Sequence, residues 1–203
     1  LTAPASSCSP ASSAALVVST NQSAASSGDG NSTRNYNDAM LALRYAYVLA
    51  LVVWLGGMVV LGAVVAPAVF QVLQVRSPAT GRMLAGAVFG TALDRFHYVA
   101  YACGGVILIT LVVMAVLGPR PASFAVRTAL VSAMLAIALY SGLVVLRSVE
   151  SLQREIGVNV SPSSLPADDV RRMRFDQLHV LSTRLMMVNM LGALVLLYWE
   201  ARE

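Results

Sequence analysis

The two histidines of the chain, His97 and His179, are the side chains best suited to hold a cofactor. Each lies near the start of a long apolar stretch, so we expect both at a similar depth in a membrane. Two histidines on facing helices at one level can ligate a single haem or chlorin inside a four-helix bundle. The alternative is that each imidazole hydrogen-bonds at a helix end near the membrane surface. We favour this second interpretation.

Arg184 is the strongest single candidate for a functional residue, because it lies about two turns inside the last apolar stretch. Charge within hydrocarbon is costly and is often functional. Asp176 or Asp94 could be its ion-pair partner. The neighbouring polar positions form a predicted stripe along one helix face, namely Asp176, His179, Ser182 or Thr183, Met186 and, nearby, Asn189. The stripe predicts either a path for a proton or small polar solute, or a structural clamp around Arg184, and we favour the clamp.

Motifs for catalysis are absent from the sequence. There is no Ser/His/Asp arrangement, no HExxH, no phosphate-binding loop and no pair of carboxylates within an apolar stretch. Cys8 lies in a polar segment and Cys103 in an apolar one, which argues against a disulfide or a CxxC-type metal or redox site. We therefore expect no enzymatic activity, no catalytic residue and no metal centre.

Long apolar stretches determine the expected fold. The chain is 57% hydrophobic and 12% charged, whereas a soluble domain has about 25% charged residues. A membrane-spanning helix needs about 20 apolar residues, and the predicted spans are about 43–70, 96–117, 125–146 and 178–199. We expect an all-α membrane protein in which residues 40–203 form a four-transmembrane-helix bundle. The third helix should continue past the membrane to about Glu155.

The segments before and between the spans also have compositions that predict their structure. Residues 1–39 form a polar N-terminal tail rich in Ser, Ala and Asn, and this composition predicts a solvated, unstructured segment. Residues 77–93 predict a short amphipathic or re-entrant helix between the first two spans. In the first span, the small residues Gly56 and Gly57 favour close helix packing, and Pro67 is expected to kink the end of the helix.

The distribution of arginine predicts an orientation. The chain has no lysine, and five arginines lie on the side of the two termini against eight on the other side. Because arginine is enriched in cytoplasmic loops, both termini are predicted outside the cytoplasm, in the bacterial inner (plasma) membrane. The net charge of +4 is spread over several loops, so nucleic-acid binding is not expected.

Several short motifs together resemble one known family. They are Trp54-Leu55-Gly56-Gly57, Ala66-Pro67 and Phe70; Ala85-Gly86 with Phe89; and Phe175, Leu178, His179 and Ser182, followed by Asn189. This combination, spread over residues 40–200, resembles a four-helix membrane family of unknown function (transmembrane-protein-205-like, domain of unknown function 4149 type). The third helix departs from the family pattern, which has Pro-Arg where this chain has Leu146-Arg147. The resemblance implies a fold and a membrane location but no activity.

Three hypotheses for the function follow. The first is a non-catalytic accessory or structural subunit of a larger, energy-transducing membrane complex, respiratory or photosynthetic, in contact with lipids and other integral membrane subunits. The second is a stand-alone protein that moves a small solute, proton or metal along the stripe around Arg184 and His179. The third and weaker one is a carrier of one haem or chlorin, held by His97 and His179 or at the protein surface. We favour the first because catalytic groups are lacking and helix faces are rich in small residues.

Overall fold

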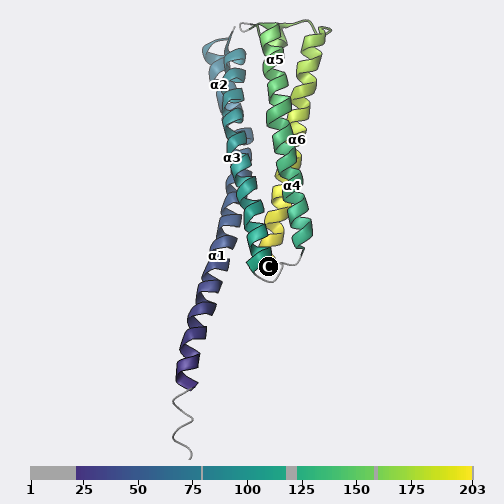
Figure 1. The fold of residues 1–203 in the computed structure, drawn as a ribbon. Helices are drawn as coiled ribbons and strands as arrows, with labels where there is room; N and C mark the ends of the chain where they lie inside the picture. The colour runs from purple at the N-terminus through teal and green to yellow at the C-terminus, as the bar shows by residue number, and fades with distance from the viewer. Residues whose placement is uncertain (1–21, 79, 118–122, 158–159, 203) are drawn as a thin grey trace, which may run out of the picture. The chain divides into compact units, whose positions relative to one another are not determined.

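The computed structural model of the chain describes residues 22–78, 80–117, 123–157 and 160–202, and these residues contain helices and turns but no strand (Figure 1). Four helical stretches are long and apolar enough to cross a membrane. They are Arg34–Arg76, Gly81–Leu117, Phe124–Ile156 and Val170–Ala201. The prediction of an all-α membrane protein with four membrane-spanning helices is confirmed.

The chain divides into two compact units, residues 1–42 and 43–203, close to the predicted boundary after residue 39. Residues 1–21 lie outside the described residues. Helix α1, Gln22–Val60, already includes residues 22–39, so the prediction of an unstructured segment is wrong for that part. Adding a residue to an existing helix is much less costly than starting one, which allows a Ser- and Ala-rich segment to be helical. Every site described below lies within residues 43–203.

The first span, Arg34–Arg76, consists of the part of α1 from Arg34 onward, the π-helix η1, Leu61–Val65, and α2, Ala66–Arg76. Pro67 lies in the first turn of α2 and has no N–H to donate to a preceding carbonyl. The N–H of Ala66 bonds to the carbonyl of Leu61, five residues earlier, as in a π-helix. The predicted irregularity near Pro67 therefore takes the form of a π-helical turn.

Helix α3, Gly81–Leu117, is a single helix. The prediction of a separate short helix over residues 77–93 is therefore wrong, because the charged pair Asp94 and Arg95 does not interrupt the backbone hydrogen bonds of α3. Helices α2 and α3 form a hairpin. Gly81 makes this hairpin tight, since a Cβ at that position would overlap the carbonyl of Leu73.

The third span comprises α4, Phe124–Tyr140, the π-helix η2, Ser141–Leu146, and α5, Arg147–Ile156, so its predicted continuation to about Glu155 is confirmed. After the short 3-10 helix η3, Pro162–Ser164, the fourth span is α6, Val170–Ala201. Asp169 caps the start of α6, because its carboxylate accepts a hydrogen bond of 2.8 Å from the N–H of Arg171.

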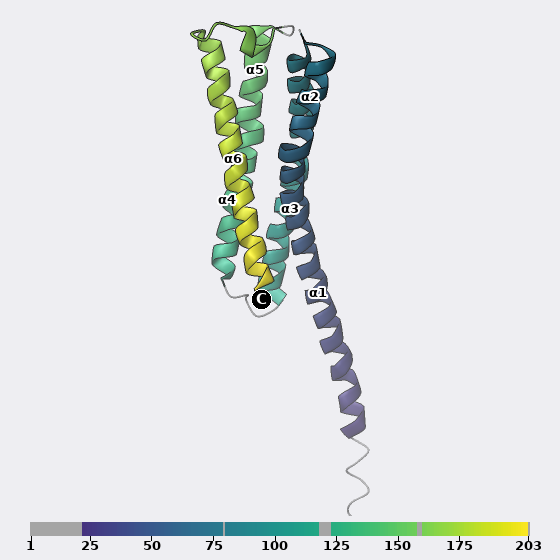
Figure 2. The ribbon, with the colours of Figure 1, turned by 180° about the vertical axis from the view of Figure 1, so that it is seen from behind.

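The core of residues 43–203 lies between the four spans. Figures 1 and 2 show α3 beside α4 and α4 beside α6, in agreement with the contacts between these helices. The largest fully buried side chains are apolar: Trp54, Leu51, Ile107, Leu111, Met134, Leu196, Val131 and Val145. At Gly57 the missing side chain admits the ring of Phe96, whereas a Cβ at Gly56 would have no atom within 4 Å. Of the two predicted packing glycines, only Gly57 makes a close helix contact.

Candidate functional site: a polar cavity at the middle of the bundle

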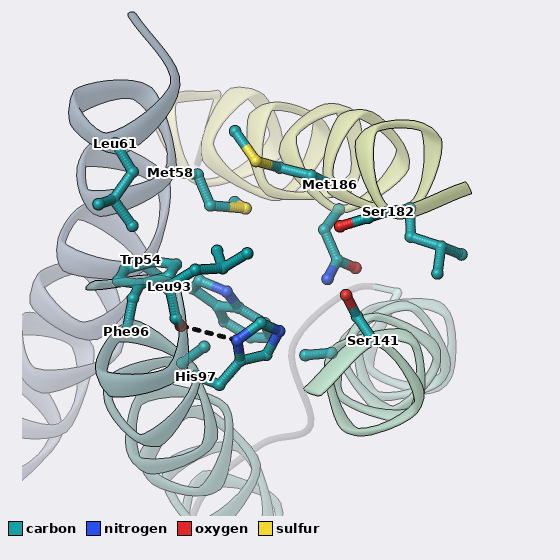
Figure 3. A pocket seen from close by; sticks show the side chains of 13 residues that line it. Trp54, Met58, Leu61, Leu93, Phe96, His97, Ser141, Ser182 and Met186 are labelled. Carbon is teal, nitrogen blue, oxygen red and sulfur yellow. Dashed lines mark hydrogen bonds between the residues drawn. The ribbon is translucent and has the colours of Figure 1, made fainter. Parts of the chain in front are cut away.

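A small cavity of about 40 Å³ lies among the four spans (Figure 3). Its lining residues are Trp54, Met58, Leu61, Leu93, Phe96, His97, Ala100, Ala138, Ser141, Ser182, Leu185, Met186 and Asn189. Trp54, Ala100, Ser141 and Leu185 each lie close to the midpoint of their span.

His97 is the buried histidine of the cavity, with 8% of its surface exposed. Its Nδ1 lies 2.8 Å from the carbonyl oxygen of Leu93 (Figure 3). Because a carbonyl can only accept, Nδ1 must be the donor, and Nε2 of the neutral ring is then an acceptor. The ring packs against Gly142, where a Cβ would overlap both His97 and the hydroxyl group of Tyr101. Helix α3 and the π-helix η2 thus fix the position of the imidazole, which lies toward Ser141 in Figure 3.

Asn189, on α6, supplies a second hydrogen-bond acceptor to the cavity, in addition to Nε2 of His97 on α3. The residue is 5% exposed, and among the described residues its Oδ1 has no hydrogen-bond partner. Ser182 and Met186 line the cavity from the same face of α6, at the spacing that a helix requires. A buried acceptor without a partner is costly. A group that donates a hydrogen bond to Oδ1 of Asn189 would remove this cost.

Both π-helical turns begin at this cavity. Leu61 is the first residue of η1 and Ser141 the first of η2, and both line the cavity. Single π-helical turns inside α-helices occur frequently at functional sites. The π-helices η1 and η2 therefore each contribute a residue to the lining of the same cavity.

The predicted polar stripe on α6 divides into two faces. Ser182, Met186 and Asn189 line the cavity, whereas Asp176, His179, Thr183 and Arg184 are exposed. The His179 ring stacks on Phe175, with ring centroids 6.5 Å apart. His97 and His179 therefore do not line one common cavity.

Arg184 lies on the outward face of α6 rather than inside the bundle. Among the described residues, no ion pair joins Arg184 to Asp176 or to the half-buried Asp94, so the structure contains neither predicted ion pair. Asp176 is about 12 Å away along the axis of α6 by helical rise, which is too far for a direct contact. The side chains around Arg184 on this face are apolar and exposed: Val180, Met187, Val188 and Leu191.

The comparison with known proteins rests on a family match. A family model described as "Domain of unknown function (DUF4149)" matches residues 49–157, which is more than half of the chain. The chain belongs to this family. The resemblance inferred from the sequence motifs is thereby confirmed. No curated protein and no solved structure matches the chain.

The family match covers only part of the candidate site. His97 and Ser141 lie inside the matched region, which ends before α6 begins. Ser182, Asn189 and Arg184 lie outside it. The polar side of the cavity is thus built jointly by the family region and by the fourth span.

A cluster that the sequence reasoning missed joins three helices at the end of the bundle where the C-terminus lies (Figure 1). Glu200 on α6 accepts hydrogen bonds from Arg127 Nη1 on α4 at 3.0 Å and from Arg44 Nε on α1 at 2.5 Å. The Arg127 and Glu200 side chains are 4% and 9% exposed, and that of Arg44 is 45% exposed. The sequence did contain a signal for this cluster. Arg127 falls within the predicted span 125–146, and a charge inside a span predicts a partner of opposite charge.

Arg127 also bears on the predicted orientation. It belongs to α4 and is buried, so it is not a loop arginine of the kind on which the positive-inside rule depends. The location of both termini outside the cytoplasm stays a prediction.

Proposed function

We propose that the chain is a non-catalytic accessory or structural subunit that docks on another integral membrane subunit through one face of α6. We name this surface the Arg184 face, and it consists of Val180, Arg184, Met187, Val188 and Leu191. The observation that supports the proposal is an exposed guanidinium surrounded by exposed apolar side chains within a membrane span.

The depth of Arg184 makes this exposure costly. Trp199 and Tyr198, near the end of α6, are residue types that prefer the membrane–water interface. Arg184 lies about 22 Å from Trp199 by helical rise, within a hydrocarbon layer of about 30 Å. By this measure Arg184 lies about 8 Å from the other edge of the layer, so its cost is below the value of about 2.5–3.5 kcal/mol that insertion scales give for a charge at the centre of a membrane helix. A carboxylate from a neighbouring subunit at the same depth would offset that cost.

A second copy of this chain is a poorer occupant of the Arg184 face. Copies in one membrane share an orientation, so a two-fold axis along the membrane normal would bring each Arg184 opposite its equivalent. Like charges at one depth repel. Asp176 is the nearest acidic residue on α6, but it lies about 12 Å along the helix axis. Charge complementarity therefore favours a different subunit, with an Asp or Glu in a transmembrane helix.

The test is purification of the tagged full-length chain from its native membranes in a mild detergent. Mass spectrometry then identifies the proteins and lipids that co-purify with the wild type, Arg184→Leu and Arg184→Lys. Arg174→Leu is the matched control, because Arg174 is also exposed on α6 and lies closer to its first turn. Thermal unfolding of each variant verifies that the chain remains folded.

We expect a stoichiometric integral membrane partner with the wild type and with Arg174→Leu. Arg184→Leu should lose this partner and Arg184→Lys should retain part of it. A wild-type chain that purifies alone contradicts the proposal, as does a partner that remains bound to Arg184→Leu. An anionic lipid that is lost only from Arg184→Leu would reassign Arg184 to a lipid phosphate.

A role in moving small species is the second candidate, and the mid-bundle cavity supports it. Its support differs from that of the sequence-based hypothesis, since His97, Ser182 and Asn189 line the cavity and Arg184 and His179 do not. The volume of about 40 Å³ restricts the species to protons or molecules of water size. The test is proton and water flux in vesicles with the wild type and Asn189→Leu, and equal flux in both would exclude this candidate.

A further inference from the structure

We propose that the mid-bundle cavity is a binding site for water, held as hydrogen-bond donor by Oδ1 of Asn189 and Nε2 of His97. This inference is independent of the Arg184 face, because Arg184 does not line the cavity. Its ligand class is a small neutral hydrogen-bond donor.

The first argument concerns the hydrogen-bond donors and acceptors among the residues that line the cavity. Asn189 is 95% buried, and its Oδ1 has no partner among the described residues. In the neutral imidazole of His97, donation from Nδ1 to Leu93 makes Nε2 an acceptor. Two acceptors cannot satisfy one another, and Oδ1 of Asn189 has no partner among the described residues, so a guest that donates hydrogen bonds fits this site. Ser141 and Ser182 add hydroxyl groups that can either donate or accept.

The second argument is size. An internal cavity needs about 10–15 Å³ to hold one water molecule, together with two to four polar partners. The volume of about 40 Å³ therefore has room for about two or three water molecules. The same volume excludes a macrocycle, a sugar or an amino acid.

The third argument is the environment around the polar groups. The remaining lining is largely apolar, including Trp54, Met58, Leu61, Phe96 and Leu185 (Figure 3). In such surroundings an unpaired amide oxygen is more costly than in contact with solvent. Water bound at this point would connect α3, η2 and α6 through one hydrogen-bond network.

Two methionines of nearly equal burial provide a direct test of bound water. Met58 is 3% exposed and lines the cavity, whereas Met134 is 2% exposed and belongs to the core outside the cavity. The full-length chain in lipid nanodiscs is exposed to millisecond X-ray pulses, which split bound water into hydroxyl radicals. In aerated buffer, a radical formed beside a methionine adds to its thioether and dissolved oxygen completes the two-electron oxidation to the sulfoxide, and mass spectrometry measures the rate at each site.

We expect Met58 to be oxidised about fivefold faster than Met134 in the wild type. Asn189→Leu should remove this difference, because it deletes the acceptor and fills the cavity. Thr110→Val is the control: its buried hydroxyl already donates to the carbonyl of Val106 and does not line the cavity. Equal rates at Met58 and Met134 in the wild type overturn the proposal. So does a rate at Met58 that Asn189→Leu, once shown to be folded, leaves unchanged.

Discussion

Arg127 and Glu200 form a buried ion pair between α4 and α6, with Arg127 Nη1 3.0 Å from Glu200 Oε2. The two residues are on different spans and each is at least nine-tenths buried. A buried pair of this kind adds little net stability relative to apolar side chains, but loss of one partner leaves a buried charge without compensation. The pair therefore makes the position of α6 against α4 sensitive to single substitutions.

Glu200→Gln is expected to lower the free energy of unfolding by about 3–5 kcal/mol, since it removes the charged carboxylate of Glu200 from the buried guanidinium of Arg127. Arg44→Gln should cost at most about 1 kcal/mol, because a partly exposed ion pair is screened by water. Denaturant unfolding of both variants in one detergent measures the difference. The double variant Arg127→Leu/Glu200→Gln should recover part of the loss. Equal losses in the two single variants would contradict a buried ion pair.

Gly57→Ala should destabilise the bundle by about 1–3 kcal/mol, the usual cost of overpacking a core. A Cβ at Gly57 overlaps the ring of Phe96, whereas Gly56 has no neighbour within 4 Å of the added atom. Gly56→Ala should thus be neutral or stabilising by up to about 1 kcal/mol, because alanine is the better helix former. Thermal unfolding of the two variants compares adjacent positions in the same helix. Similar behaviour of both would show that Phe96 moves freely away from α1.

Gly142→Ala should displace His97, because the new methyl group overlaps the imidazole and the Tyr101 hydroxyl. We expect a loss of about 1–3 kcal/mol, while Gly105→Ala, which meets no atom within 4 Å, serves as the control. Adding Tyr101→Phe to Gly142→Ala removes one of the two overlapping groups and should restore part of the stability. The measurement is thermal unfolding of all three variants. Failure of Tyr101→Phe to restore any stability would argue against this contact.

Stability of the fourth span should depend on the ionisation of Asp169. Side-chain and backbone hydrogen bonds from Arg171 hold the pKa of the Asp169 carboxyl below its ordinary range. A lowered folded-state pKa stabilises the fold above the unfolded value of about 3.9, and this contribution disappears as pH falls through the lower folded-state pKa.

The corresponding measurement is unfolding of the wild type and Asp169→Ala between pH 7 and pH 2, a range that spans the carboxyl pKa of about 3.9. The stability difference should be constant down to about pH 5 and shrink below about pH 4. Asp168→Ala is the control, since the cap of α6 is Asp169 and Asp168 is exposed. A difference that persists unchanged to the lowest pH would exclude the ionised cap.

The number and approximate positions of the spans follow from the sequence alone. Apolar stretches longer than the hydrocarbon layer have no stable alternative to membrane-spanning helices, and all four predicted spans lie within helical stretches. The start of α6 was also predictable, because a capping carboxylate is a local signal. The boundary at residue 93 was not predictable, since Asp94 and Arg95 tolerate a continuous helix and α3 begins at Gly81 instead.

The direction in which each polar side chain points is decided by tertiary structure. Helical spacing places Ser182, Met186 and Asn189 on one face, but the sequence does not say which face meets α3 and α4. Arg184 and His179 were therefore expected inside the bundle and lie outside it. Glu200 had no local signal at all, because its partners Arg44 and Arg127 belong to other helices. Hydropathy along one chain specifies burial in the membrane, whereas burial inside the protein depends on which helices pack together.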